Sequence, residues 1–172
     1  MKRVFCLAAL AAVLLGHGYS AQAAGIEFAI GQTSDSTMTY RLGLQSEWDK
    51  SWWQSEVGRL TGYWDGAYTF WDGDETASNH SLSFSPVLVY EFAGESVRPY
   101  LEVGIGVAVF AHTEVENNKL GSAFQFEDRF GAGLRFAGGH EVGIRATHYS
   151  NAGISSPNDG VESYALHYTM AL

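Results

Sequence analysis

The chain has 172 residues, of which 10 are Lys or Arg and 19 are Asp or Glu, and its formal net charge is −9. This acidic balance argues against nucleic acid as a partner, because phosphate binding needs clustered cationic side chains. The single cysteine is Cys6. The chain beyond it therefore has no thiol for a disulfide or a thiolate nucleophile.

The first 23 residues have the pattern of a secretory signal peptide. Lys2 and Arg3 give a charged start, residues 4–15 form a short apolar run, and residues 21–23 read Ala-Gln-Ala, a small-x-small cleavage site. We therefore expect a signal peptide over residues 1–23 and a single domain over residues 24–172. No later apolar run approaches the ~20 residues that a transmembrane helix needs.

After this segment, apolar and polar residues alternate with a period of two, which predicts β-strands. The expected strands cover residues 26–33, 37–48, 53–66, 80–92, 98–111, 122–136, 140–150 and 161–172. The segment 53–66 alternates poorly, and Asp128 interrupts the apolar face of 122–136. The registers of these two strands therefore stay open.

The glycines and charged residues share one face of these strands. Glu102, Arg129 and Arg145 lie on that face, whereas Leu, Phe and Val lie on the other. A soluble core would reverse this arrangement, but a small barrel in lipid would pair its charges in a packed lumen. Most of the strands are also as long as the ~9–11 residues of a tilted membrane strand. The sequence therefore predicts an all-β, eight-stranded antiparallel transmembrane β-barrel of the outer membrane.

The connections between the expected strands alternate in length. Those at 49–52, 93–97 and 137–139 are short, whereas those at 67–79, 112–121 and 151–160 are long. Because outer-membrane barrels have short periplasmic turns and longer outward loops, we expect loop 151–160 to face outward. All five tryptophans suit interfacial girdles: Trp48, Trp52, Trp53, Trp64 and Trp71. Side chains fill an eight-stranded barrel, so we expect function on its outside or in its loops.

The last two expected strands bring chemically useful side chains together. His148 and Glu162 are equidistant from Ser155, so pairing around loop 151–160 places them opposite each other. His148 and Ser150 are two residues apart and so share one face. A nucleophile, a base and a carboxylate on one patch are what an activated serine requires.

An ester hydrolase also needs hydrogen-bond donors where oxyanion charge develops. Loop 151–160 offers Asn151, Asn158 and the backbone around Ala152 and Gly153. Neighbouring apolar residues, such as Ala146, Tyr164 and Leu166, would provide a groove for an acyl chain; no other substrate-binding residue is predicted.

A structural interpretation of the same residues is also open. Charged side chains near the rim of a membrane barrel cost only ~0–1 kcal/mol. His148, Ser150 and Glu162 could therefore be solvated residues of the rim. The acidic run at residues 72–75 could hold a divalent cation but lacks the ligand spacing of a calcium loop, which favours a solvated loop tip.

Near its end the chain reads His148-Tyr149-Ser150-Asn151-Ala152-Gly153, followed by Pro157-Asn158-Asp159-Gly160 and Glu162. This segment resembles the active-site segment of the outer-membrane lipid A 3-O-deacylases, the PagL family. The resemblance implies a serine hydrolase site on the lipid-facing exterior near the outer rim. It implies removal of the ester-linked 3-hydroxyacyl chain at position 3 of lipid A. Ser150 would be the nucleophile, His148 the general base and Glu162 its orienting carboxylate. Asn158, with N–H groups near Ala152 and Gly153, would supply the oxyanion donors.

This reading implies lipid A as substrate, outer-membrane lipids as surroundings, and neither a cofactor nor a metal. The oligomeric state is open, with a homodimer as one option. Two rival functions are a different lipid enzyme that uses the same serine, such as an acyltransferase or phospholipase, and a non-enzymatic barrel that serves adhesion or envelope structure.

Overall fold

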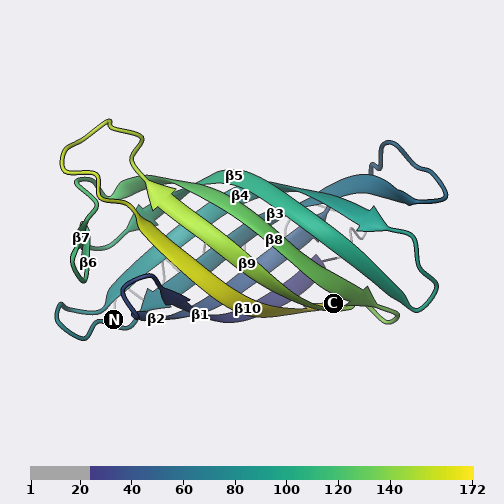
Figure 1. The fold of residues 1–172 in the computed structure, drawn as a ribbon, viewed down its shortest axis with the longest axis horizontal. Coiled ribbons are helices and arrows are strands. Elements are labelled where there is room, and N and C mark those ends of the chain that lie inside the picture. The colour runs from purple at the N-terminus through teal and green to yellow at the C-terminus, as the bar shows by residue number, and fades with distance from the viewer. Residues whose placement is uncertain (1–23) are drawn as a thin grey trace, which may run out of the picture.

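The computed structural model describes residues 24–172, so the predicted signal peptide lies outside the described residues. Eight antiparallel strands form a closed barrel in the order β1-β10-β9-β8-β5-β4-β3-β2 (Figure 1). These strands are β1 (Ala24–Thr33), β2 (Met38–Glu47), β3 (Gly58–Trp71), β4 (Asn79–Phe92), β5 (Val97–Phe110), β8 (Phe124–Phe136), β9 (His140–Ser150) and β10 (Val161–Ala171). A small hairpin of β6 (Glu114–Val115) and β7 (Asn118–Lys119) lies within the connection from β5 to β8. The predicted eight-stranded barrel is confirmed. Within residues 24–172, no helix is long and apolar enough to cross a membrane.

The strands place apolar side chains outside and polar ones inside, as the alternation predicts. In β9, for example, Ile144 is 65% exposed whereas the adjacent Arg145 is 5% exposed. Successive side chains of a strand point to opposite faces, so one strand can supply both surfaces. The outer surface is therefore a continuous apolar band, and the lumen is polar.

Paired charges fill the middle of the lumen. Arg145 bonds to Glu27 at 2.8 Å (Nη2–Oε2) and to Glu102 at 2.6 Å (Nε–Oε1). Arg129 bonds to Asp65 at 2.7 Å (Nη2–Oδ2). All five side chains are buried. Pairing compensates the desolvation of each charge, and loss of one partner would leave another charge buried and unpaired.

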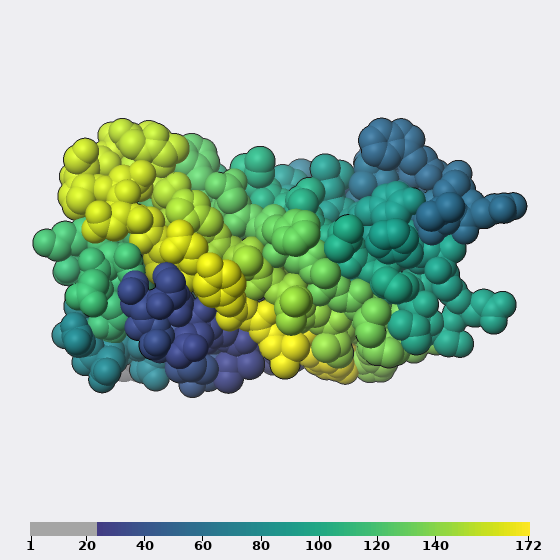
Figure 2. Space-filling view, viewed as in Figure 1, coloured from purple at the N-terminus to yellow at the C-terminus, as the bar shows by residue number. Residues whose placement is uncertain are grey.

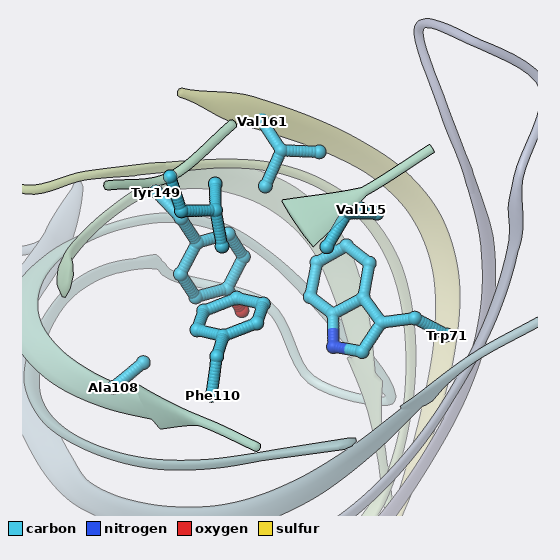
Figure 3. Packing of buried hydrophobic residues seen from close by; sticks show 7 residues of the cluster. Trp71, Ala108, Phe110, Val115, Tyr149 and Val161 are labelled. Atoms are coloured by element: carbon cyan, nitrogen blue, oxygen red, sulfur yellow. The ribbon is translucent and has the colours of Figure 1, made fainter. Parts of the chain in front are cut away.

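An apolar cluster closes the lumen above these charges, at the end where β9 leads into β10. Its members are Trp71, Ala108, Phe110, Val115, Leu120, Tyr149 and Val161, all buried. Figure 3 shows the rings of Trp71, Phe110 and Tyr149 turned toward one another within the ring of strands. The lumen therefore offers no open passage at this end, which leaves the outer surface and the loops for function.

The connections lie at two ends of the barrel. Four are at the loop end, namely residues 34–37, 72–78, 111–123 and 151–160; three are at the terminal end, namely residues 48–57, 93–96 and 137–139. In Figure 1 the yellow-green loop 151–160 and the β6–β7 hairpin lie at the same end. The first described residue and the last residue meet at the other end, where Leu172 N donates to Ala24 O at 2.7 Å.

The expected bounds of the third strand and of both connections beside it are wrong. The strand predicted at 53–66 is β3 (Gly58–Trp71), so the connection expected at 49–52 spans 48–57 and that expected at 67–79 spans 72–78. The cause is a shift in register after β2. Glu47 pairs with Tyr63, so an unbroken register would place residue 50 opposite Leu60, but the isolated bridge joins Leu60 to Trp52. The chain between is irregular, and for this reason it does not alternate.

The tryptophans divide between two environments. Trp52, Trp53 and Trp64 are exposed on the outer surface, and Trp48 contacts both Trp52 and Trp64 edge to face. Trp71, expected in a girdle, is instead 1% exposed within the lumen cluster. Because β3 extends to residue 71, odd positions such as this one face inward.

Candidate active site

The pairing of β9 with β10 places His148 directly across from Glu162, which confirms the predicted register. Nδ1 of His148 and Oε1 of Glu162 are 2.8 Å apart, and both side chains are 42% exposed. The imidazole thus has one nitrogen bonded to a carboxylate, which fixes the ring and leaves Nε2 for another partner. This is the arrangement by which a carboxylate orients a catalytic histidine.

Ser150 ends β9, two residues beyond His148, and pairs with Phe126 of β8. It is partly exposed on the same outer face as His148. Its hydroxyl has no hydrogen-bond partner within residues 24–172, and it does not bond to His148. The structure therefore joins His148 to Glu162 but leaves the nucleophile candidate beside them and unbonded. Bonds of this kind are often long in free enzymes and shorten when substrate binds.

Asn151 organises the loop that follows Ser150. Its side-chain oxygen accepts the N–H of Gly153 at 2.9 Å, and its amide nitrogen donates to Leu120 O at 2.8 Å and to Ser155 O at 2.9 Å. The residue is fully buried. Because these bonds occupy its amide, Asn151 is a structural residue and not the free donor that the sequence suggested.

The three predicted oxyanion donors differ in what they can still offer. Asn158 accepts the N–H of Asn151 on its side-chain oxygen at 2.9 Å, which leaves its amide N–H groups unbonded in the described part of the chain. Ala152, at φ 54°, also has a backbone N–H without a partner there. The N–H of Gly153 is already bonded to Asn151. Within residues 24–172, Asn158 and Ala152 therefore keep an N–H group free to donate, whereas Gly153 does not.

Gly160 lies against the imidazole of His148. It has φ +71°, and a Cβ built at this position would be 3.0 Å from Cε1 of His148. A side chain here would be strained by its backbone conformation and would also press on the ring. A glycine at this position therefore gives His148 room for its present orientation.

Two residues beside the site were not identified from the sequence as part of it. Asp128 pairs directly with His148 across β8 and β9 and is exposed. Both residues are equally far from the short turn at 137–139, so hairpin symmetry could have predicted this pairing. Ser34, in the β1–β2 connection, donates its hydroxyl to Oε2 of Glu162 at 3.3 Å. No local pattern reveals that contact, because it forms only when β1 closes the barrel against β10.

An apolar groove runs along the outer face below His148 and Glu162. A hollow of about 290 Å³ beside these two residues shares Phe130, Ala146 and Tyr164 with a second hollow of about 410 Å³ further down β8, β9 and β10. Ala146 and Tyr164 thus line the groove as predicted. Leu166 instead lines a separate hollow on the β1 side of β10.

The remaining candidates have structural roles. The acidic loop 72–75 is held by Glu116, whose carboxylate accepts the backbone N–H of Asp74 at 2.6 Å and that of Glu75 at 3.0 Å. No group of three or more His, Cys, Asp or Glu within residues 24–172 is arranged to hold a metal ion. Asp159 accepts the N–H of Lys119 at 2.9 Å and so ties loop 151–160 to β7.

Comparison with known proteins identifies the relatives of this barrel. A family model described as "Lipid A 3-O-deacylase (PagL)" matches residues 38–171. Lipid A deacylase PagL of Pseudomonas aeruginosa is 60% identical over 173 residues, which cover 100% of both chains. Lipid A deacylase PagL of Bordetella bronchiseptica is 35% identical over 123 residues, or 68% of each chain. The crystal structure of the outer membrane enzyme PagL superposes with a TM-score of 0.83 at 59% identity, covering 86% of this chain and 99% of that one.

Proposed function

Because the chain belongs to the PagL family of lipid A 3-O-deacylases, we propose that it hydrolyses the ester at position 3 of lipid A through Ser150, His148 and Glu162. The observation that carries the proposal is the 2.8 Å bond between His148 and Glu162 beside Ser150. This bond holds a base next to a free hydroxyl on the lipid-facing side of an outer-membrane barrel.

The reaction begins at the Ser150 hydroxyl. Its oxygen attacks the ester carbonyl while Nε2 of His148 takes its proton, and Glu162 stabilises the imidazolium that results. The oxyanion of the tetrahedral intermediate accepts hydrogen bonds from the Asn158 amide and the Ala152 N–H. Collapse of the intermediate breaks the bond to the sugar oxygen, which leaves with the proton from His148.

The second half of the reaction clears the acyl-enzyme. His148 takes a proton from water, the hydroxide adds to the acyl carbonyl, and the ester to Ser150 breaks. The products are the 3-hydroxy fatty acid and the regenerated serine, whose oxygen recovers the proton from His148. His148 thus accepts one proton and returns one proton in each half of the reaction.

The position of the site suits a substrate that stays in the membrane. Ser150 and His148 lie at the loop end of β9, and the apolar groove below them runs toward the middle of the barrel wall. An acyl chain in this groove would keep its hydrocarbon beside Phe130, Ala146 and Tyr164 and its ester near Ser150. The substrate therefore reaches the nucleophile without leaving the lipid layer.

The test compares the wild type with Ser150→Ala, both purified in detergent and incubated with lipopolysaccharide. Mass spectrometry of lipid A should show loss of one 3-hydroxyacyl chain and release of the free acid with the wild type only. Equal release by both proteins would overturn Ser150 as nucleophile. Transfer of the chain to an acceptor lipid, or attack on phospholipid alone, would instead favour the acyltransferase or phospholipase.

A further inference from the structure

The Glu162 carboxylate is held at both of its oxygens. Oε1 is 2.8 Å from Nδ1 of His148, and Oε2 accepts the hydroxyl of Ser34 at 3.3 Å. Ser34 is 128 residues away in the sequence, in the connection between β1 and β2. Figure 2 shows how this becomes possible, since the purple β1 segment lies directly against the yellow β10 on the surface.

The connection that carries Ser34 is fixed by its own hydrogen bonds. Thr33 N donates to Thr37 O at 2.9 Å, Thr37 N donates to the Thr33 hydroxyl at 3.0 Å, and Ser36 N donates to Thr33 O at 3.1 Å. Thr33 and Thr37 are buried. Thr33 also pairs with Ser163 of β10, so the tight turn begins next to Glu162. The backbone therefore presents the Ser34 hydroxyl to the carboxylate.

We propose that Ser34 is a positioning residue for deacylation, whose hydroxyl holds Oε2 of Glu162 so that Oε1 stays on His148. The inference rests on the proposed function. Glu162 is 42% exposed, and a second hydrogen bond restricts the rotation that a single bond to His148 leaves to its carboxylate. A base held in one orientation accepts the serine proton more often in a productive geometry.

Ser34 also distinguishes the two carboxylates that flank His148. Asp128 faces the imidazole from β8 and Glu162 faces it from β10. The described residues give the Asp128 side chain no hydrogen-bond partner, whereas they give Glu162 both His148 and Ser34. Glu162 is thus the carboxylate that is fixed before substrate arrives.

The test measures kcat and KM of Ser34→Ala, Ser34→Thr and Ser36→Ala with lipopolysaccharide. Ser34→Ala should lower kcat about 3- to 10-fold, the effect of one partly exposed hydrogen bond, and should leave KM unchanged. Ser34→Thr keeps the hydroxyl and should restore kcat. Ser36→Ala removes a hydroxyl from the same turn that has no partner among the described residues, and should match the wild type.

A double variant separates positioning from a general structural effect. In a Glu162→Gln background, Ser34→Ala should cost no further activity, because the carboxylate that it positions is gone. Wild-type kcat in Ser34→Ala, a change in KM alone, or a full additional loss in the double variant would each overturn the inference. If Ser150→Ala were as active as the wild type, the proposed function itself would fail. If Ser150→Ala is inactive and Ser34→Ala has wild-type kcat, only the role of Ser34 fails.

Discussion

His148 and Glu162 face each other across two strands joined by a ten-residue loop, and their side chains meet at 2.8 Å (Nδ1–Oε1). The register of β9 and β10 brings the two residues together, so the barrel wall sets where the imidazole and the carboxylate meet. A site built on strands is held more precisely than one built on loops. In the proposed mechanism, loop 151–160 supplies the oxyanion donors.

The two carboxylates beside His148 should contribute unequally. Glu162→Gln removes the charge that orients and stabilises the imidazolium, and should lower kcat by about 10²–10⁴-fold. Asp128→Asn should have a much smaller effect, because the imidazole bonds to Glu162 and not to Asp128. Steady-state kinetics of the two variants checks this. A larger loss of kcat in Asp128→Asn would mean that Asp128, and not Glu162, orients His148.

Gly160→Ala should impair the site through contact with His148. The new Cβ would be 3.0 Å from Cε1 of the ring and would have φ +71°, a conformation that costs a non-glycine residue about 1–2 kcal/mol. We expect lower stability and lower kcat together. The control is Gly138→Ala, at φ +93° in the turn at the terminal end, where the nearest side-chain atom is 3.7 Å away. It should lose stability only. Equal kcat in both variants would argue that Gly160 does not set the position of His148.

An aromatic residue at position 146 should block the proposed acyl groove. Ala146 lines both hollows of the groove, so Ala146→Phe should reduce kcat/KM, and more so for substrates with longer acyl chains. Val103→Phe makes a similar change on the outer face of β5, where Val103 is exposed, and serves as the control. Activity of Ala146→Phe that equals the control for every chain length would place the acyl chain elsewhere.

Arg145 should be essential for the stability of the barrel. Arg145→Met leaves Glu102 buried without its cation and Glu27 with Arg41 as its remaining arginine, which should cost about 3–5 kcal/mol. Arg59→Met breaks a pair with Glu91 in which the Arg59 side chain is 37% exposed, and should cost at most ~1 kcal/mol. Urea unfolding in lipid vesicles measures both. Similar losses would contradict a central role for the lumen network.

Much of this architecture could be predicted because strand alternation and hairpin symmetry are local properties. The pairing of His148 with Glu162 follows from their equal distances to Ser155, and β9 and β10 keep that register throughout. The prediction failed where regularity fails. The shift in register after Glu47 places β3 further along the chain than its expected bounds. Trp71, which was expected in the interfacial girdle, is therefore buried inside the lumen.

The parts of the site that escaped prediction depend on closure of the barrel or on loop side chains. Ser34 meets Glu162 only because β1 pairs with β10. Asn151 is occupied by backbone partners, and composition does not distinguish a residue that builds a loop from one that binds an oxyanion. A periodic pattern specifies which face a side chain occupies, but the partners within that face depend on tertiary structure.

Every step of the proposed reaction depends on the Ser150 hydroxyl acting as the nucleophile. The most direct measurement is labelling of the active, detergent-solubilised enzyme with a fluorophosphonate, which modifies activated serines, followed by peptide mapping by mass spectrometry. We expect a single adduct on Ser150 that forms in step with loss of activity, is prevented by excess lipid A and is strongly slowed by His148→Asn. Complete inactivation with the label on another residue, or full labelling of Ser150 without loss of lipid A deacylation, would contradict it.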